Sequence, residues 1–286
     1  MSISPERCHH LFQKTERSLL KLSSSQQADR VHSFRTTARR LQTLLEEVIP
    51  ERSRNQKKLL KLLDQIRKRA GKVRDLDVQL AALRSFKIAQ EPRRKTQLTQ
   101  GLIELRAKHE KRLRKILQKD AICGIRKRLR RALKELRVKT GSDPLLAARG
   151  MLAQARGPEA KLTEDVLHRY RVAVKRARYA AEFAPRSAEA TEFLAQLKRL
   201  QDVIGDWHDW LTLKESAVAS LGNVNESSLV AALHNVTGGK FRRAVAEVSA
   251  LQTKPVPELV PAGPSKGPHR LSGAAAPGKE QTDSAA

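Results

Sequence analysis

Two short segments of the chain carry the same pattern of side chains that could hold an anion. Each has a histidine followed by two cations at helical spacing, namely His32, Arg35 and Arg39 in the first segment and His168, Arg171 and Lys175 in the second. On a helix that advances about 100° per residue, each set falls within an arc of about 60°. Guanidinium groups form short, charge-assisted and often bidentate bonds to phosphate oxygens, so such a row could hold a chain of phosphates.

The two rows belong to a longer internal repeat. Residues 31–46 (VHSFRTTARRLQTLLE) align with residues 167–182 (LHRYRVAVKRARYAAE), so that Arg40 matches Arg176 and Glu46 matches Glu182. Further along, GKVRD at 71–75 aligns with GDWHD at 205–209. The identities fall on polar positions, whereas the apolar positions change size. We therefore predict two copies of one helical unit, over about residues 5–118 and 121–250.

Each row has an apolar face behind it, so that a helix could face a core while its cations face water or ligand. In the second copy Arg178 joins the row. A row of arginines on a single helix is usually only its solvated face, but recurrence in two copies favours a shared ligand. Taken singly, either histidine is as readily structural as a ligand contact, and their paired placement favours contact.

The histidines suggest a pH dependence. A phosphate beside His32 and His168 would favour their charged forms and raise their pKa above the ordinary value of about 6.5. Binding is then expected to tighten as the pH falls from about 8 toward about 6.

The composition indicates an anionic partner. The 286 residues include 57 Lys plus Arg against 30 Asp plus Glu, which leaves a formal net charge of +27. Such an excess repels itself unless it meets a polyanion such as nucleic acid, an acidic membrane surface or polyphosphate. Aromatic residues make up 3% of the chain, which argues against a protein that stacks single-stranded bases on exposed rings.

The elements that position these residues are predicted to be helices throughout, an all-α fold. Apolar residues recur at spacings of three and four, prolines mark boundaries, and alternating strand-like runs are absent. Gly71 and Gly205 are expected to end helices, and Gly238 with Gly239 to kink the last one. The predicted helices span residues 5–22, 27–49, 51–70, 74–88, 92–118, 121–138, 144–155, 162–184, 187–204, 207–221 and 226–250.

The composition of the C-terminal segment differs from that of the helical part of the chain. Residues 251–286 are rich in Pro, Gly, Ser and Ala without periodic apolar positions, so a disordered tail is expected. The N-terminus lacks a signal-like apolar run, and no stretch is apolar enough to span a bilayer. Cys8 and Cys123 lie far apart and show no redox or metal spacing. We expect a cytoplasmic protein that has no membrane partner.

Further residues could extend the basic surface or bind metal. The cations expected to contact the ligand include Arg74, Lys108, Arg112 and Arg243, although most such charges are simply solvated. Asp75 and Asp209 follow the two glycines and are expected to cap the next helices, or else to hold Arg74 and His208 in place. No zinc-like His pair or Cys spacing occurs, so no metal and no cofactor are expected.

At these motifs the chain resembles the conserved histidine α-helical domain (CHAD) family. The match consists of HxxRxxxRR at His32, HxxRxxxKR at His168, GKVRDLDV at Gly71 and GDWHDWLT at Gly205, in that order, within a domain of residues 1–250. The resemblance implies two helical bundles related by a pseudo-two-fold axis around a basic central groove. It also implies polyphosphate binding at polyphosphate granules through His32, Arg35, Arg39, Arg40, His168, Arg171, Lys175 and Arg176.

The sequence departs from the family pattern at two points. Lys175 replaces a more usual arginine, which keeps the charge and loses the guanidinium fork, and the residues after Asp209 weaken the second acidic motif. No E-x-E-x-K strand of the triphosphate-tunnel domain found in many relatives occurs here, so a stand-alone binding module is expected.

Three functions remain open from the sequence. A non-catalytic polyphosphate-binding module is favoured, because its ligand carries charge and no bases. A nucleic-acid-binding protein is the alternative, since net charge cannot distinguish one phosphate polymer from another. An enzyme acting on phosphate esters is disfavoured, because no phosphate-cradling glycine loop, paired catalytic carboxylates or nucleophile elbow is recognised.

Overall fold

The computed structural model describes residues 5–49, 51–88, 90–137, 143–156 and 162–252, and every regular element in these ranges is a helix. The prediction of an all-α fold is therefore confirmed. Of the tail predicted over residues 251–286, the first two residues belong to the last helix, and residues 253–286 lie outside the described residues. Among the helices described, none is long and apolar enough to cross a membrane.

Two sets of helices follow one another along the chain. The first set consists of α1 (Pro5–Ser24), α2 (Ala28–Thr43), a π-helical turn η1 (Leu44–Val48), α3 (Arg54–Ser85), α4 (Pro92–Ile116) and α5 (Lys119–Lys134). The second set consists of α6 (Pro144–Arg156), α7 (Glu164–Ala181), α8 (Ala188–Leu221) and α9 (Ser228–Gln252). The repeated segments of the sequence thus fall on α2 and α7 and on α3 and α8.

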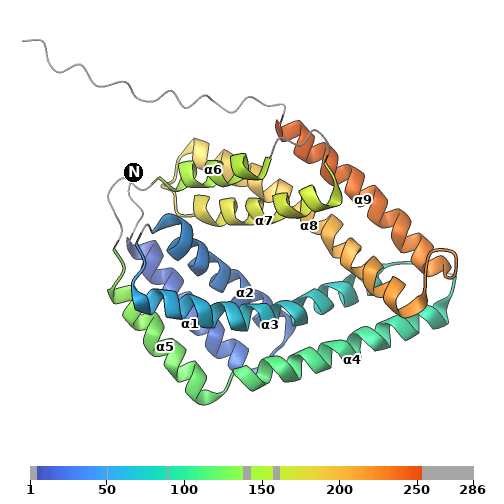
Figure 1. Cartoon of the computed structure of the whole chain (residues 1–286), viewed down its shortest axis with the longest axis horizontal. Coiled ribbons are helices and arrows are strands. Elements are labelled where there is room, and N and C mark those ends of the chain that lie inside the picture. Colours follow the sequence, from blue (N-terminus) through green and yellow to red (C-terminus); the bar gives the residue numbers. More distant parts are fainter. Residues whose placement is uncertain (1–4, 50, 89, 138–142, 157–161, 253–286) are drawn as a thin grey trace, which may run out of the picture.

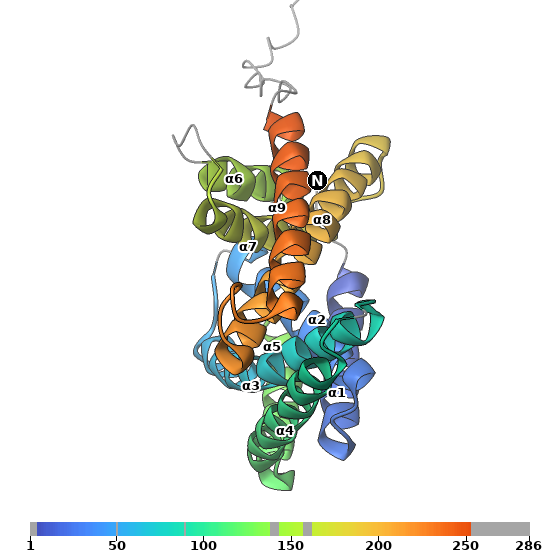
Figure 2. The same ribbon diagram turned by 90° about the vertical axis from the view of Figure 1, so that its right-hand side faces the viewer.

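The two sets meet along the helices that carry the repeats. Helix α2 packs against α7, and α3 packs against α8, while α1 and α5 cover the first set and α6 and α9 the second. Figure 1 shows the long pairs α3 with α4 and α8 with α9 converging at one end of the molecule. Figure 2 looks at that end, where the four helices lie against one another. The pseudo-two-fold relation between the sets stays a prediction.

Two apolar clusters hold this arrangement. The larger one contains residues of both sets, and Trp207, Tyr170 and Phe34 are its largest fully buried side chains. The smaller one joins the converging ends of the four long helices through leucines such as Leu80 of α3 and Leu213 of α8. Because the larger cluster spans both sets, the two copies fold on one shared core.

The two motif glycines do not end helices, contrary to the prediction. Helix α3 runs through Gly71 and α8 runs through Gly205, so each pair of predicted helices is one continuous helix. Among the described glycines, the one with a positive φ is Gly222, at the end of α8. Tertiary packing on both sides of each motif overrides the weak helix propensity of a single glycine.

This correction has a direct test in Gly205→Ala. Since Gly205 has helical backbone and a Cβ there would meet nothing within 4 Å, alanine should raise the free energy of unfolding by about 1 kcal/mol. Chemical denaturation followed by circular dichroism measures this change.

Gly222→Ala is the matched control. There φ is 89°, and a Cβ would collide with the Glu226 carboxylate. Alanine should lower the free energy of unfolding by about 1–3 kcal/mol. Destabilisation by both substitutions would show that Gly205 does end a helix.

Candidate anion-binding site

A cavity of about 200 Å³ lies where α2, α3, α7 and α8 meet. Its walls hold more cations than anions. The lining residues are His32, Arg35, Thr36 and Arg39 from α2, Arg67, Arg74, Asp75 and Val78 from α3, Arg171, Lys175 and Tyr179 from α7, and Gln201 and Asp209 from α8. Except for His168 and Arg178, the residues of the two rows predicted from the repeat therefore line one shared cavity.

Arg35 is held against α3 at the first motif glycine. Its Nη1 donates to Asp75 Oδ1 at 3.2 Å and to the Gly71 carbonyl oxygen at 3.5 Å. A Cβ on residue 71 would stand 3.7 Å from Arg35 Nη2, so a side chain larger than alanine would displace the guanidinium. Gly71 thus gives the arginine room to lie across the helix.

The two motif aspartates do not cap helices, contrary to the prediction. Asp75 lies inside α3 and Asp209 inside α8, where backbone N–H groups already bond within the helix. Asp75 pairs with Arg35, whereas Asp209 lines the cavity and lies 4.0 Å from His208 Nδ1. Their role is to meet the cations of the cavity.

Four cavity cations form no ion pair with any described residue, namely Arg39, Arg74, Arg171 and Lys175, and burial lowers the pKa of three of them, Arg39, Arg171 and Lys175. The buried Nε of Arg171 has no hydrogen-bond partner. Arg67 differs from them because it pairs with Asp64 one turn earlier on α3. Since buried charges are normally paired, these three unpaired cations at one cavity indicate a place for an external anion.

Burial and the neighbouring cations lower the pKa values of these three cations. Burial, reinforced by the neighbouring Arg171, lowers the pKa of Lys175 from 10.5 to about 7. Burial and then Arg67 lower the pKa of Arg39 to about 10, and burial also lowers that of Arg171. On the opposite wall burial raises the pKa of Asp209, against the effect of Arg171 and Lys175. A bound anion would favour the charged forms of the cations.

The two histidines of the repeat have different surroundings. His32 lines the cavity, and its pKa is lowered by burial and by the nearby Arg74. His168 lies outside the lining, and its ring centroid is 5.3 Å from that of His208. Burial and Arg171 lower the pKa of His208 to about 3. Without a ligand, His32 therefore titrates below its ordinary range, and Lys175 is the cavity group that titrates near neutral pH.

Several cations predicted to contact the ligand are used in other ways. Arg40 of α2 forms a bidentate pair with Glu182 at 2.5 and 3.0 Å, and Arg176 of α7 pairs with Glu47 of η1. Arg178 bonds to Gln201 at 3.1 Å and lies near Glu182. The pairs of Arg40 and Arg176 join the two copies to each other, whereas Arg178 connects α7 to α8 within the second copy.

The π-helical turn shifts the partner of Arg176 by one residue. The sequence alignment placed Glu46 over Glu182, but Glu46 accepts from Gln42 of its own helix. Glu47 instead occupies the place that corresponds to Glu182, because a π-turn inserts one extra residue into a helix.

Of the four further cations predicted to contact the ligand, one lines the cavity and three do not. Arg74 lines the cavity, whereas Lys108 and Arg112 of α4 and Arg243 of α9 are exposed and lie outside the lining. Arg67 also lines the cavity, although it is not among the predicted ligand contacts. Once α3 is one helix, the spacing of Arg67, Gly71, Arg74 and Val78 puts them on one face, and taking Gly71 as a helix end hid that signal.

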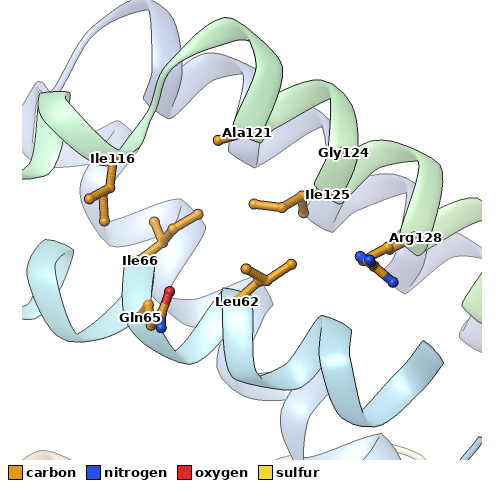
Figure 3. Close-up of a pocket in the computed structure, with 8 residues that line it drawn as sticks. All are labelled: Leu62, Gln65, Ile66, Ile116, Ala121, Gly124, Ile125 and Arg128. Carbon is orange, nitrogen blue, oxygen red and sulfur yellow. The ribbon is translucent and has the colours of Figure 1, made fainter. Parts of the chain in front are cut away.

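A second cavity has a different character. It has a volume of about 250 Å³ and lies between α3, α5 and the end of α4. Figure 3 shows Leu62, Ile66 and Ile125 turned toward one another, with Arg128 at one end. Its mainly aliphatic walls could not replace the hydration of a phosphate. In the part of the chain that the structure describes, no three His, Cys, Asp or Glu residues come together to hold a metal.

The unpaired charge of Lys175 should lower stability in a defined pH range. Its pKa is about 7 in the folded chain against 10.5 ordinarily, so the unfolded chain binds more protons between these values and stability falls as the pH falls from about 10.5 to about 7. Lys175→Met should therefore raise Tm at pH 7 by at least about 2 °C, with a smaller gain at pH 10. Thermal unfolding at both pH values measures it.

Lys198→Met is the control, because Lys198 is exposed and already pairs with Asp202. It should leave Tm nearly unchanged. An equal gain from Lys175→Met at both pH values would mean that packing, and not charge, limits stability at this position.

Comparison with known proteins agrees with this architecture. A family model described as CHAD domain matches residues 6–217. The crystal structure of the CHAD domain from the plant Ricinus communis superimposes with a TM-score of 0.65 at 17% sequence identity, over 88% of this chain and 91% of that one. No curated protein matches the sequence. Because the family model covers well over half of the chain, the protein belongs to the CHAD family.

Proposed function

We propose that the protein binds inorganic polyphosphate in the cavity between α2, α3, α7 and α8, and does not cleave it. The observation that carries this proposal is the group of partly buried cavity cations whose pKa burial lowers and which have no ion pair, namely Arg39, Arg171 and Lys175. They come from both copies, so a ligand that neutralises all three must carry several negative charges close together. Membership of the CHAD family supports the same ligand class.

A phosphate polymer fits these walls better than a nucleic acid. The lining offers guanidinium and ammonium donors, and its one Phe, Tyr or Trp side chain among the described residues is Tyr179. Arg40 already lies over that ring, 5.4 Å from its centroid. Bases would therefore find no open aromatic surface in the cavity on which to stack.

The proposal includes binding without turnover. The two carboxylates of the lining are Asp75, which pairs with Arg35, and Asp209, which faces Arg171 and Lys175. Cations of this kind stabilise phosphate oxygens, but cleavage also needs an activated nucleophile. Incubation of the purified protein with polyphosphate and Mg²⁺ or Mn²⁺ should release no orthophosphate. Association with polyphosphate granules in the cytoplasm would follow from binding alone.

The test of the site is a matched pair of charge-removing variants. Arg39→Met with Arg171→Met removes two cavity cations and should weaken binding at least tenfold, since a hydrogen bond to a charged group contributes about 1.5–3 kcal/mol. Lys108→Met with Arg112→Met removes the same charge from the exposed face of α4 and should weaken triphosphate binding much less. Isothermal titration with triphosphate and with long-chain polyphosphate gives both affinities.

Equal losses in the two variants would show that net charge, and not the cavity, binds the ligand. In competition, long-chain polyphosphate should displace labelled DNA or RNA at a far lower phosphate concentration than nucleic acid displaces polyphosphate. The reverse order would support the nucleic-acid alternative.

Binding should also depend on pH through Lys175. Its pKa of about 7 in the free protein should rise toward the ordinary lysine value beside phosphate, so binding takes up a proton between about pH 9 and 7. Affinity should then increase as the pH falls, by up to about tenfold per pH unit. The charged residues that act on this amine are Arg171, Asp209, Arg35 and Arg39, and the cavity also holds His32, Arg67, Arg74, Asp75 and Tyr179.

Titrations at several pH values measure this slope. Lys175→Arg should flatten it, because a guanidinium stays charged throughout this range. If the slope is unchanged in Lys175→Arg, another group takes up the proton.

A further inference from the structure

Lys175 differs chemically from the other unpaired cations of the cavity. Its counterpart in the first copy is Arg39, which keeps its proton at any physiological pH. A lysine amine, in contrast, becomes a nucleophile once it loses its proton. The second copy of the repeat therefore places a potentially reactive group where the first places an inert one.

The surroundings of Lys175 favour the unprotonated amine. The side chain lines the cavity, forms no ion pair with a described residue, and shares the space with Arg35, Arg39 and Arg171. Asp209 is the carboxylate that opposes these charges from α8, and burial weakens its acidity. Burial and the neighbouring cations bring the pKa of Lys175 to about 7, so about half of the amines are neutral at that pH.

We propose that Lys175 is an acylation site whose donors are small acyl phosphates, the mixed anhydrides of a carboxylic acid and phosphoric acid. The inference relies on the proposed function in one respect, which is that the cavity accepts phosphate groups. The phosphate of the donor would lie against the guanidinium groups of Arg39 and Arg171, which places its carbonyl carbon near the amine of Lys175. A cavity of about 200 Å³ accommodates a donor as small as acetyl phosphate.

The reaction is a balanced acyl transfer. The amine nitrogen forms a bond to the carbonyl carbon, and the bond from that carbon to the bridging oxygen breaks. The phosphate departs with the electron pair and receives the proton that the amine loses, giving an amide and hydrogen phosphate. The guanidinium groups favour this step, because they stabilise the negative charge that grows on the departing phosphate.

Acylation would change the cavity permanently. An amide nitrogen cannot be protonated, so the cavity loses the charge that phosphate would otherwise restore to Lys175. Polyphosphate and acyl phosphates should therefore compete for the same space, and an acylated protein should bind polyphosphate more weakly than the unmodified one.

The experiment compares two lysines within one molecule. The full chain is incubated with acetyl phosphate at about pH 7.5, and acetylation at Lys175 and Lys198 is followed by peptide mass spectrometry. Lys198 is exposed and paired with Asp202, and an exposed lysine has only about one amine in a thousand neutral at this pH. The initial rate at Lys175 should exceed that at Lys198 at least tenfold, and equal rates would overturn the proposal.

Two further measurements distinguish recruitment of the donor phosphate by the cavity from the reactivity of the amine itself. Excess triphosphate should suppress acetylation at Lys175 and leave Lys198 unaffected. A neutral acetylating ester without phosphate should still modify Lys175 but show less preference for it over Lys198. A preference that is as large with this ester, or that triphosphate does not reduce, would mean that the cavity does not recruit the donor phosphate, and would also overturn the proposal.

The outcome is distinguishable from failure of the proposed function. Polyphosphate binding is measured by titration on the same preparation. Binding without preferential acetylation would defeat this inference alone, whereas preferential acetylation that triphosphate suppresses, without binding of long-chain polyphosphate, would defeat the proposed function alone. In Lys175→Arg, with its fold checked by circular dichroism, the modification at this position should be absent.

Discussion

Repulsion among like charges at the junction of four helices is the constraint on which the rest of this structure depends. Arg39, Arg171 and Lys175 meet at one cavity without an ion pair from the described residues. Burial, and then the neighbouring cations, lower the pKa of Lys175, so a charged amine held at this place lowers stability. The grouping persists only if the surrounding scaffold holds the helices together more strongly than the charges push them apart.

The scaffold opposes that repulsion from two sides. Near the cavity, the pairs of Arg40 with Glu182 and of Arg176 with Glu47 join α2, α7 and η1 across the two copies. At the far end, a separate apolar cluster locks α3 and α4 against α8 and α9. There Glu91 caps α9 by accepting from Ser227 Oγ and from the Leu229 amide. The cavity therefore lies between two fixed ends, which keeps it open to a ligand.

The difference between the two copies gives the cavity its chemistry. One copy supplies guanidinium groups, which hold charge at any relevant pH, and the other places Lys175 at the matching position. A single amine among guanidinium groups makes the site sensitive to pH and open to acyl transfer, while the shape of the cavity is kept. A repeat that diverges at one position can thus acquire a property that neither copy has alone.

The sequence by itself determined the helical class, the repeat and the two rows of cations, because helix periodicity and duplication can be recognised from the spacing of residues along the chain. The helix ends predicted at Gly71 and Gly205 were wrong, because tertiary packing on both sides stabilises one continuous helix through each glycine. The tertiary structure decided which cations are neutralised. The partner of Arg40 lies 142 residues away, and ion pairing and burial depend on such distant contacts, which no local pattern specifies.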